Sequence, residues 1–568
     1  MKQYHVLDHG FVSDGKTCNA AAMSRLLAHI KEEAEIVFPA GSFYFCEAVR
    51  VEGHKHLTIS GSAGTTILLH YDPCGDYKKN SGFLVCVGCT DLVIRGLTIR
   101  ASGVTGWMGT VTAINREERY YEVKIDDIFA VTGLEHPAAV NSCDEEETPD
   151  YALSGVVESG EVPVLIDGKK YTRLSGMAYE VIGDHLIRVP IPEWQGTHRL
   201  RVGHRLLYRM SYYSPPVFYF SHTVNALLED IEMPHIGEMG VIIGARSANF
   251  TFRRFNIRVE KDEPYRFAAN KDGIHICGLM GYLHVYDCHF SGLGDDALNI
   301  HSAAAGISEI LDDGRVRLSH RVNSGERPLP VDWAEPGDLL EVYDPTTLAC
   351  KAKLRVGEKE GDVFRFTEIK GRFEKGDVLA NTAYYAATHV SGCTVRNTRA
   401  RAFLFQTRNV LMENCHLYGL SLPGVIVSPD IRYWYEVGPS ENVVIRHNIF
   451  EKCCLFPYMA NAGAIVMKAS HDGAMGDYPA GVHRNVQIYG NTFRHIGNSA
   501  IYLTAAAGGE IYDNLFEDCC YLQNQEHLFM RRDVALQNCE RITMWDNKTS
   551  QDEKDLYYTK GCKNIKKT

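Results

Sequence analysis

Long hydrophobic runs are missing from this sequence. No stretch approaches the ~18 consecutive apolar residues that mark a membrane-spanning helix, so no membrane span is predicted. The first ten residues, MKQYHVLDHG, also lack the apolar segment of a secretory signal peptide. We therefore expect a cytoplasmic protein, or a secreted one if a signal peptide has been removed.

Excess positive charge and metal-binding patterns are scarce as well. The formal net charge is −12, spread along the chain, whereas proteins that bind nucleic acid usually present a basic face. The 17 cysteines form no disulfide framework, and no Cys-x-x-Cys spacing accompanies the adjacent pairs Cys453-Cys454 and Cys519-Cys520. We interpret most cysteines as small buried residues in a reducing compartment, and we predict no metal and no cofactor.

Patterns typical of helices and of antiparallel hairpins are rare. One segment, residues 19–34 (NAAAMSRLLAHIKEEA), suits an amphipathic helix that caps the N-terminal end of a fold. Asn-Gly and Asp-Gly turns between apolar alternations are sparse, which argues against an ordinary β-sandwich. With 568 residues, 45% of them hydrophobic, the chain is nevertheless long and apolar enough for two or three packed domains.

The sequence does contain an internal repeat. Its copies begin with an apolar residue, continue through a polar or small turn residue, and in most cases end on an apolar one. Where neither of the two interruptions described below separates them, neighbouring copies start 23 to 43 residues apart, which indicates a unit of ~23 residues with longer loops in some units. Such a unit cannot bury a core alone but can do so when stacked, so we predict a right-handed parallel β-helix. The copies are IRGLTI (94–99), LEDIEM (228–233), FRRFNI (252–257), VYDCHF (285–290), MENCHL (412–417), IRHNIF (445–450), IYGNTF (488–493) and IYDNLF (511–516).

A second repeat column predicts where three carboxylates lie. It consists of a small residue followed by apolar-x-apolar. When the copy at 272–276 is aligned with the copy at 296–300, at an offset of 24, Asp272 stacks under Asp296 and beside Asp295. Neighbouring strands of a parallel sheet lie ~4.8 Å apart, so the three carboxylates are predicted to meet at one strand edge. The copies are MGVII (239–243), DGIHI (272–276), DALNI (296–300), RAFLF (401–405), PGVIV (423–427) and SAIYL (499–503).

Two segments interrupt the repeat. Residues 103–220 and 303–387 alternate like antiparallel strands, and each is long enough for a small β-barrel or sandwich. The predicted fold class is therefore all-β, a solenoid with two inserted domains. Its five parts are N-terminal coils with the capping helix (1–102), a first inserted barrel (103–220), coils that carry the aspartates (221–302), a second inserted barrel (303–387) and C-terminal coils (388–568).

The three clustered aspartates allow two interpretations. A single aspartate at a solenoid turn is most simply a structural cap or a calcium ligand, and that interpretation stays open for each one alone. Three on one face favour glycoside hydrolysis. That reaction needs one protonated carboxyl to donate to the leaving oxygen and one ionised carboxylate to act on water or on the sugar carbon.

At these residues the sequence resembles known β-helix enzymes. The Asn-x-Asp of residues 270–272, followed one coil later by the Gly-Asp-Asp of 294–296, is similar to polygalacturonase-type hydrolases. The fuller pattern DGIHI…GLGDDALNIH more closely resembles glycoside hydrolase family 110, α-1,3-galactosidases that remove terminal galactose from blood-group-B-like and related glycans. That family is a β-helix with two β-barrel inserts, so the resemblance covers most of the chain. Its specificity lies in residues 270–302 and in the inserts.

The resemblance implies an inverting hydrolase. Asp272, Asp295 and Asp296 would contain its acid and its base, and the two carboxyls would lie ~6.5–9.5 Å apart to leave room for water. The pattern does not say which aspartate has which role. The Gly-His-Gly and Arg-x-Lys signatures of polygalacturonases are not evident, and without an Arg/Lys pair for a uronate carboxylate a neutral sugar is favoured.

Candidate substrate contacts surround the cluster, and each has a structural alternative. Arg401 shares the column of the aspartates, His301 shares a neighbouring column with Gln406, and the loop at 428–440 offers aromatic and acidic side chains. The structural alternatives are as follows. Asn270 would stabilise a turn, His301 would be a structural histidine with its hydrogen bonds satisfied, and the aromatic side chains of the 428–440 loop would pack that loop against the protein. The candidates are Asn270, Lys271, His301, Arg401, Trp434, Tyr435 and Glu436.

The leading hypothesis is an exo-acting, metal-independent α-1,3-galactosidase. Its partner would be an oligosaccharide or glycoconjugate with a terminal α-galactose, and long solenoid faces favour a homo-oligomer. The alternatives are a β-helix hydrolase for another α-glycan, a β-helix lyase that requires calcium, and a non-catalytic glycan-binding solenoid.

Overall fold

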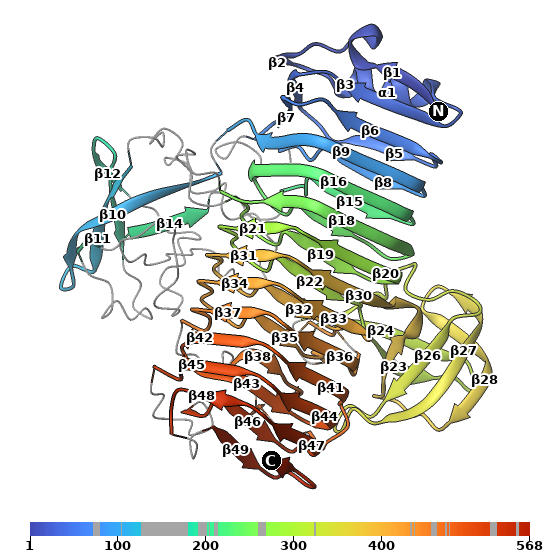
Figure 1. Cartoon of the computed structure of the whole chain (residues 1–568). Helices are drawn as coiled ribbons and strands as arrows, with labels where there is room; N and C mark the ends of the chain where they lie inside the picture. Colours follow the sequence, from blue (N-terminus) through green and yellow to red (C-terminus); the bar gives the residue numbers. More distant parts are fainter. Residues whose placement is uncertain are drawn as a thin grey trace.

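The chain folds into a long solenoid of stacked coils (Figure 1). The computed structural model describes residues 1–71, 80–103, 105–126, 180–190, 202–203, 205–209, 214–259, 268–322, 325–431, 434–436, 438–455, 463–471, 474–475, 478–522, 531–552 and 556–567. In Figure 1 the coils run from the N-terminal end, in blue, to the C-terminal end, in red, and two groups of strands project from opposite sides. The predicted parallel β-helix with antiparallel insertions is confirmed.

The larger sheet contains the first repeat. Its strands are β1 (Lys2–His5), β2 (Asp14–Cys18), β3 (Ala34–Phe38), β4 (Gly41–Phe45), β6 (Leu57–Gly61), β7 (Thr65–Leu69), β9 (Thr90–Ala101), β16 (Val224–His235), β18 (Ser247–Ile257), β20 (Leu279–Tyr286), β21 (His289–Ser291), β30 (Tyr385–Ser391), β31 (Thr394–Arg396), β33 (Val410–Glu413), β34 (His416–Tyr418), β36 (Glu441–Arg446), β37 (Ile449–Glu451), β41 (His483–Tyr489), β42 (Thr492–Ile496), β44 (Ala506–Tyr512), β45 (Leu515–Cys519), β47 (Glu540–Trp545), β48 (Lys548–Thr549) and β50 (Lys566–Lys567). First residues of the predicted copies pair in register: Leu228 with Ile94 and Phe252, and Ile488 with Ile445 and Ile511. The stacking inferred from the repeat is correct.

The second sheet contains the second repeat and positions the aspartates. Its 12 strands, all parallel, are β5 (Val49–Glu52), β8 (Leu84–Val87), β15 (Phe218–Ser221), β17 (Val241–Ile243), β19 (Ile274–Cys277), β22 (Leu298–His301), β32 (Phe403–Phe405), β35 (Val425–Val427), β38 (Gly463–Met467), β43 (Ser499–Thr504), β46 (Val534–Gln537) and β49 (Tyr557–Lys560). Ile274 pairs with Leu298 and Ile276 with Ile300, which is the predicted offset of 24.

Apolar side chains that point between the sheets form one continuous core. Ile274 and Ile300 are at most 1% exposed. Phe450, Phe493 and Phe516, from successive coils, stack with ring centroids 4.8 and 5.2 Å apart. Because each coil buries its apolar residues against its neighbours, the repeat forms a core that one unit could not form alone.

The capping helix is shorter than predicted. Helix α1 spans Ala20–His29 and buries Met23, Leu26 and Leu27. The helical pattern predicted from the sequence runs to residue 34, but Ala34 begins β3, where it pairs with Lys2 and Leu57. Pairing within the sheet therefore overrides the helical propensity of the last predicted residues. Two short 3-10 turns, η1 (Val6–His9) and η4 (Thr382–Tyr384), complete the helical residues in the ranges above. None of the helices described is long and apolar enough to cross a membrane.

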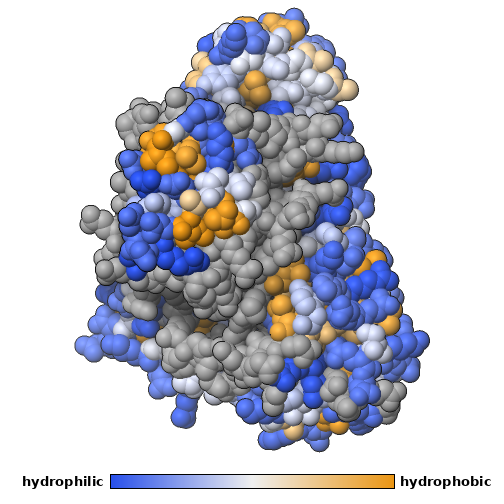
Figure 2. Space-filling model, turned by 90° about the vertical axis from the view of Figure 1, so that its left-hand side faces the viewer, coloured by the Kyte–Doolittle hydropathy of each residue, from blue (hydrophilic) through white to orange (hydrophobic). Residues whose placement is uncertain are grey.

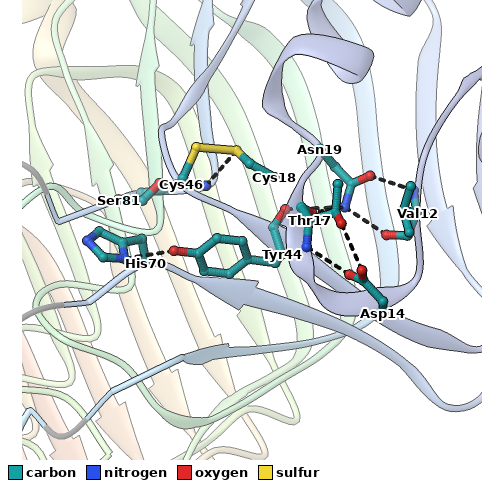
Figure 3. Close-up of a disulfide and its surroundings, with 10 residues drawn as sticks. Val12, Asp14, Thr17, Cys18, Asn19, Tyr44, Cys46, His70 and Ser81 are labelled. Carbon is teal, nitrogen blue, oxygen red and sulfur yellow. Dashed lines mark hydrogen bonds between the residues drawn. A yellow bond between two sulfur atoms is a disulfide. The ribbon is translucent and has the colours of Figure 1, made fainter.

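A disulfide joins the first coils of the solenoid (Figure 3). Cys18 at the end of β2 is bonded to Cys46, just after β4, with Cα atoms 5.6 Å apart. Nearby, the Tyr44 hydroxyl forms a hydrogen bond with Nδ1 of His70 at 2.8 Å. The spacing of the cysteines did not reveal this bond, because residues 28 apart meet only through the pairing of β2 with β4. Ten other cysteines in the described segments are buried, as expected for most of them.

The second insertion contains a closed antiparallel barrel. Six strands close because β23 pairs with both β24 and β29, and β25 extends β24 at the edge. The strands are β23 (Ala305–Ile310), β24 (Val316–Val322), β25 (Gly325–Arg327), β26 (Leu339–Tyr343), β27 (Cys350–Glu360), β28 (Val363–Gly371) and β29 (Val378–Asn381). The barrel has its own core, centred on Trp333, Leu354 and Phe364.

The first insertion is described in part. Five antiparallel strands form one sheet, β10 (Gly106–Asn115), β11 (Tyr120–Ile125), β12 (Glu180–Gly183), β13 (Leu186–Pro190) and β14 (Arg205–Arg209). Most of residues 127–213 lie outside the described residues. A two-stranded ribbon, β39 (Ser470–His471) and β40 (Ala474–Met475), completes the strands. The division of the chain into five parts stays a prediction.

Figure 2 shows the side of the molecule that carries β10–β14. Its coloured surface is mostly hydrophilic, with separate hydrophobic patches rather than one broad apolar face. The homo-oligomer stays a prediction.

Candidate active site

The three aspartates meet at one edge of the second sheet. Asp272 lies two residues before β19, and the pair Asp295-Asp296 lies just before β22, one coil away. One carboxylate oxygen of each lies within 4.8 Å of the others. The backbone N–H of Asp296 donates to Oδ1 of Asp272 at 2.9 Å. Gly273 permits this approach, because a Cβ there would lie 2.7 Å from the carbonyl oxygen of Ala297. The coil register thus brings the predicted carboxylates together.

Arg401 is the counter-charge of Asp296. Its Nε and Nη2 donate to the two carboxylate oxygens of Asp296, each at 2.7 Å, and its backbone N–H donates to Oδ1 at 3.2 Å. Burial raises the pKa of Asp296 to about 7, and the charges of Asp295 and Asp272 raise it as well, whereas Arg401 lowers it. A bidentate pair of hydrogen bonds from a guanidinium requires both carboxylate oxygens to accept, so in this arrangement Arg401 holds Asp296 in its ionised form. Arg401, a candidate substrate contact from the column of the aspartates, therefore lies at the acid cluster; its contact with substrate stays a prediction.

Asp272 begins a line of ionisable side chains. Nδ1 of His275 lies 2.7 Å from Oδ2 of Asp272, and Nε2 of His275 lies 3.1 Å from Nε2 of His301. Nδ1 of His301 lies 3.3 Å from Oε1 of Glu436. His301 and Glu436 were both candidate contacts, and the structure places them side by side at the aspartate cluster.

Burial and neighbouring charges shift the pKa of each group in this line. Burial alone would lower the pKa of His275, but Asp272, Glu436 and Asp296 raise it above the ordinary value. Burial, together with His275 and His320, holds the pKa of His301 well below its usual range. Burial and the charge of Asp430 raise the pKa of Glu436 to about 7. Perturbed ionisable groups gathered in this way are typical of active sites.

The loop with Trp434, Tyr435 and Glu436 is fixed against the second barrel. Glu436 forms antiparallel bridges with Ala303 and Asp430, and the backbone N–H of Ala304 donates to the carbonyl of Tyr435 at 2.7 Å. Tyr435 is only 3% exposed, so the packing role considered for this loop applies to it. Trp434 is 45% exposed and can contact a sugar.

Asn270 and Lys271 have structural contacts. The side-chain amide of Asn270 donates to the carbonyl oxygens of Thr105 and Gly237, and the residue is fully buried. Nζ of Lys271 lies 4.0 Å from Oε1 of Glu238. These contacts connect the aspartate coil to the neighbouring coil and to the start of the first insertion. For Asn270 they are bonds between distant segments rather than the local bonds of a turn, and its contact with substrate stays a prediction.

Two residues near the cluster were missed by the sequence analysis. His275 projects from the middle of DGIHI, a position treated only as the polar residue of an alternation. Lys468 directly follows Met467 of β38, which pairs with Val427. Burial and the charge of Arg401 lower the pKa of Lys468, while Asp430 raises it, so all three groups lie close enough to interact. Recognising GAIVM (463–467) as a further copy of the second column would have located Lys468.

The carboxylate oxygens of the three aspartates also lie close enough together for a cation to bridge them. Arg401, however, already takes both carboxylate oxygens of Asp296, so the protein supplies a positive charge of its own to the cluster. A group of acidic residues does not by itself establish a metal site, and no step below depends on a metal.

Comparisons with known proteins identify relatives. No family model matches the sequence. The chain is 24% identical over 550 residues to α-1,3-galactosidase A of Shewanella woodyi, covering 89% of this chain and 84% of that protein. It is 24% identical over 341 residues to α-1,3-galactosidase B of Bacteroides thetaiotaomicron, covering 58% of this chain and 54% of that protein. Among solved structures, a family 28 exopolygalacturonase of Yersinia enterocolitica has a TM-score of 0.43 and 12% identity, covering 99% of this chain and 78% of the other.

The carboxylate cluster and the curated relatives together define a glycoside hydrolase, so the substrate is a carbohydrate. The resemblance to α-1,3-galactosidases that residues 270–302 indicate is confirmed by these relatives.

Proposed function

We propose that this chain is an exo-acting hydrolase that removes terminal α-1,3-linked galactose from blood-group-B-like or linear α-galactosyl glycans. The observation that carries the proposal is the meeting of Asp272 with Asp295 and Asp296, whose oxygens lie within 4.8 Å of one another. The names of the curated relatives support galactose as the sugar. Arg401, Trp434 and Glu436 are the proposed contacts of the galactose hydroxyls and ring face.

We assign the general base to Asp272 or Asp296 and the general acid to Asp295. Asp272 and Asp296 accept hydrogen bonds from His275 and Arg401 respectively, and such bonds favour the ionised form that a base requires. Asp295, the more exposed member of the pair, remains as the carboxyl that donates a proton to the leaving oxygen.

Inversion is proposed from the family resemblance. In inverting enzymes the two carboxyls lie ~6.5–9.5 Å apart, whereas in a retaining mechanism they lie ~5–5.5 Å apart and one of them attacks the sugar carbon.

The decisive experiment is a screen against galactosides. The purified protein is incubated with α-1,3-, α-1,4- and α-1,6-linked digalactosides, and the first anomer released is followed by proton NMR. We expect release from the α-1,3 substrate, with β-galactose appearing first. First appearance of α-galactose would replace inversion by retention, and no galactose from any α-1,3 donor would overturn the proposed substrate.

A variant separates an enzyme from a glycan-binding solenoid. Asp272→Asn changes one oxygen to an amide and should abolish turnover while leaving the thermal midpoint of unfolding within a few degrees. Unchanged galactose release by the folded variant would remove Asp272 from the reaction.

A further inference from the structure

Four side chains form a line from the aspartate cluster to the loop that carries Trp434. The line is Asp272, His275, His301 and Glu436, with successive contacts of 2.7, 3.1 and 3.3 Å. The side chains of His301 and Glu436 are 8% and 14% exposed, so little water competes for the contact between them, whereas that of His275 is 24% exposed. The first two contacts are hydrogen bonds. The third has the distance of an ion pair but not the angle of a hydrogen bond, so Glu436 must turn to complete the line.

The contact between the two histidines requires one proton between them. Two bare ring nitrogens, or two protonated ones, would repel each other at 3.1 Å. When the proton belongs to His275, that ring carries two protons, donates one to Asp272, and is a cation. His301 then carries its own proton on Nδ1 and faces an ionised Glu436. When the proton belongs to His301, His275 is neutral and Nδ1 of His301 accepts from a protonated Glu436.

We propose that His275 and His301 form a proton relay between Asp272 and Glu436. In the transfer, Nε2 of His275 gives its proton to Nε2 of His301, while Nδ1 of His301 gives its proton to Oε1 of Glu436. The number of protons and the total charge are the same before and after, and one positive charge leaves the side of Asp272. The role of this relay in catalysis rests on the proposed function.

The relay has a direct use for a general base. Before the reaction, the imidazolium of His275 is stabilised by the carboxylate of Asp272. If Asp272, rather than Asp296, is the base and takes a proton from water, that imidazolium loses its counter-charge, and its proton passes to Glu436. The site therefore avoids accumulating positive charge next to the positively charged sugar of the transition state. In this account His275 and His301 are positioning residues.

The pKa shifts at the two ends of the line act in the same direction. Burial raises the pKa of Glu436 to about 7, and Asp272 is among the groups that raise the pKa of His275, so each end holds a proton more tightly than an isolated side chain does. The pKa of His301 is held well below its usual range, as suits a bridge that passes the proton on. Other ionisable groups that act on the line are Asp296, Asp430, Arg401, His320 and Cys277, and Lys468 acts through Arg401 and Asp430.

The test is a double-mutant cycle read by NMR of protein labelled with ¹⁵N-histidine, which does not need activity. The titration midpoint of His275, assigned with His275→Asn, is measured in four forms: wild type, Glu436→Gln, His301→Gln and the double variant. Through a relay, Glu436→Gln should shift the midpoint by at least half a pH unit when His301 is present and much less when it is absent. Equal shifts in both backgrounds would mean direct electrostatics and would overturn the relay.

An activity arm links the relay to catalysis. For His301→Gln we expect kcat for galactose release to fall about 10- to 100-fold, less than the ~10²–10⁴-fold that a positioned acid or base itself contributes, because His301 acts only through His275. The limb of the kcat/KM profile near neutral pH should move, and the dependence of kcat on the D₂O fraction should change from curved to linear. A lower kcat with an unmoved pH profile and an unchanged D₂O dependence would assign His301 a structural role only.

The matched control is His389→Gln. His389 also pairs with a glutamate, Glu413, at 3.0 Å, but on the other sheet. It should leave the pH profile and the His275 titration unchanged, and a similar shift in this variant would overturn the specificity of the relay. If the wild type releases no galactose at all, the proposed function fails, while the NMR cycle still decides the relay.

Discussion

At the scale of single residues, the buried carboxylates differ in what holds them. Asp296 accepts two bonds from a guanidinium, and Asp272 accepts one from an imidazole and one from a backbone N–H. Chemically identical groups, one coil apart, thus have different environments, and different environments let a pair of carboxyls serve as acid and base.

The proposed acid is tested by the leaving group. Asp295→Asn should slow release of galactose from α-1,3-linked glycans by ~10²–10⁴, because a sugar alkoxide leaves only when protonated. It should slow a dinitrophenyl α-galactoside far less, since that leaving group needs no proton. Steady-state kinetics with both substrates measure the difference. The comparison variant Asp272→Asn should lose both activities alike; equal losses in Asp295→Asn would instead make Asp295 something other than the acid.

Glu436 gives a prediction for stability against pH. Its native pKa of about 7 lies above the ~4.3 of an unfolded glutamate, so the native state binds this proton more tightly. The stability that this proton provides is complete below about pH 4 and is lost as the pH rises to about 7. Glu436→Gln removes that loss. Relative to wild type, the variant should therefore gain about 1–3 kcal/mol of unfolding free energy between pH 5 and pH 8.

Glu413 supplies a control of opposite sign. Burial raises its pKa, but Arg446 and His389 outweigh burial and lower it. Glu413→Gln should therefore be less stable than wild type at pH 8, with a difference that shrinks towards pH 4. Thermal midpoints across this pH range report both variants, and parallel curves for Glu436→Gln and wild type would contradict the shift at Glu436.

At the residue scale, sequence patterns could predict contacts along a column but not across it. The offset of 24 predicted that Asp272 meets Asp296, and the shared column predicted that Arg401 approaches them. The contact between His275 and His301 arises differently. The two residues occupy different columns of the repeat, and they meet because their side chains point toward each other, which brings the two Nε2 atoms into contact. A repeat pattern specifies strand positions, whereas side-chain direction depends on packing that one sequence does not display.

At the scale of elements, the second barrel acts as a clamp on the site. Its first strand follows Ala303 and Ala304, which bond to Glu436 and Tyr435. Nη2 of Arg408, just after β32, donates to Oε2 of Glu341 in the barrel at 2.6 Å, and its Nε donates to the carbonyl of Pro439 in the loop at 3.1 Å. Coil, barrel and loop are therefore held together by one half-buried arginine.

Removing that arginine should loosen the clamp. In Arg408→Met, the buried carboxylate of Glu341 loses its guanidinium partner and keeps Lys353, 3.0 Å away, and the hydroxyl of Tyr343, so we expect a loss of about 3 kcal/mol. Proteases should then cut the barrel and the 428–440 loop faster, and KM for the galactoside should rise more than kcat falls. Arg317→Met, which removes a surface pair with Asp362, should cost at most about 1 kcal/mol and change neither readout. Equal protease resistance in Arg408→Met and wild type would show that the clamp does not depend on Arg408.

The sequence predicted the boundaries of elements where the solenoid repeat stops or resumes. It predicted them less well where a segment was compatible with both a helix and a strand. The closed barrel falls within the segment where the repeat disappears, and β30 resumes the solenoid at Tyr385 by pairing with Leu279. The end of α1 was wrong by several residues, because Ala34 is helix-compatible in isolation yet belongs to a strand in the assembled coil. Pairing with distant residues decides such cases.

At the scale of the whole molecule, a stacked solenoid couples each coil mainly to its neighbours. Asparagines at equivalent turns make this coupling visible in the C-terminal half. The buried side-chain amide of Asn448 donates to Asn491, that of Asn491 to Asn514, and that of Asn514 to Asn547, each at 3.0 Å. Since each link joins adjacent coils, damage to one asparagine should weaken the coils around it rather than the whole chain.

Asn491→Ala tests this locality. It leaves the buried N–H groups of Asn448 and the carbonyl of Ile445 without their partner, at a cost of ~1–3 kcal/mol for each unsatisfied group. Hydrogen–deuterium exchange should accelerate in residues 441–519, while the aspartate coils at 268–301 and galactose release at 25 °C stay unchanged. The surface residue Asn485, changed to Asp, should leave exchange as in wild type, because exposed substitutions usually shift stability by less than about 0.5 kcal/mol. Faster exchange along the entire solenoid in Asn491→Ala would mean that the coils unfold as one unit, and nearest-neighbour coupling would then be wrong for this molecule.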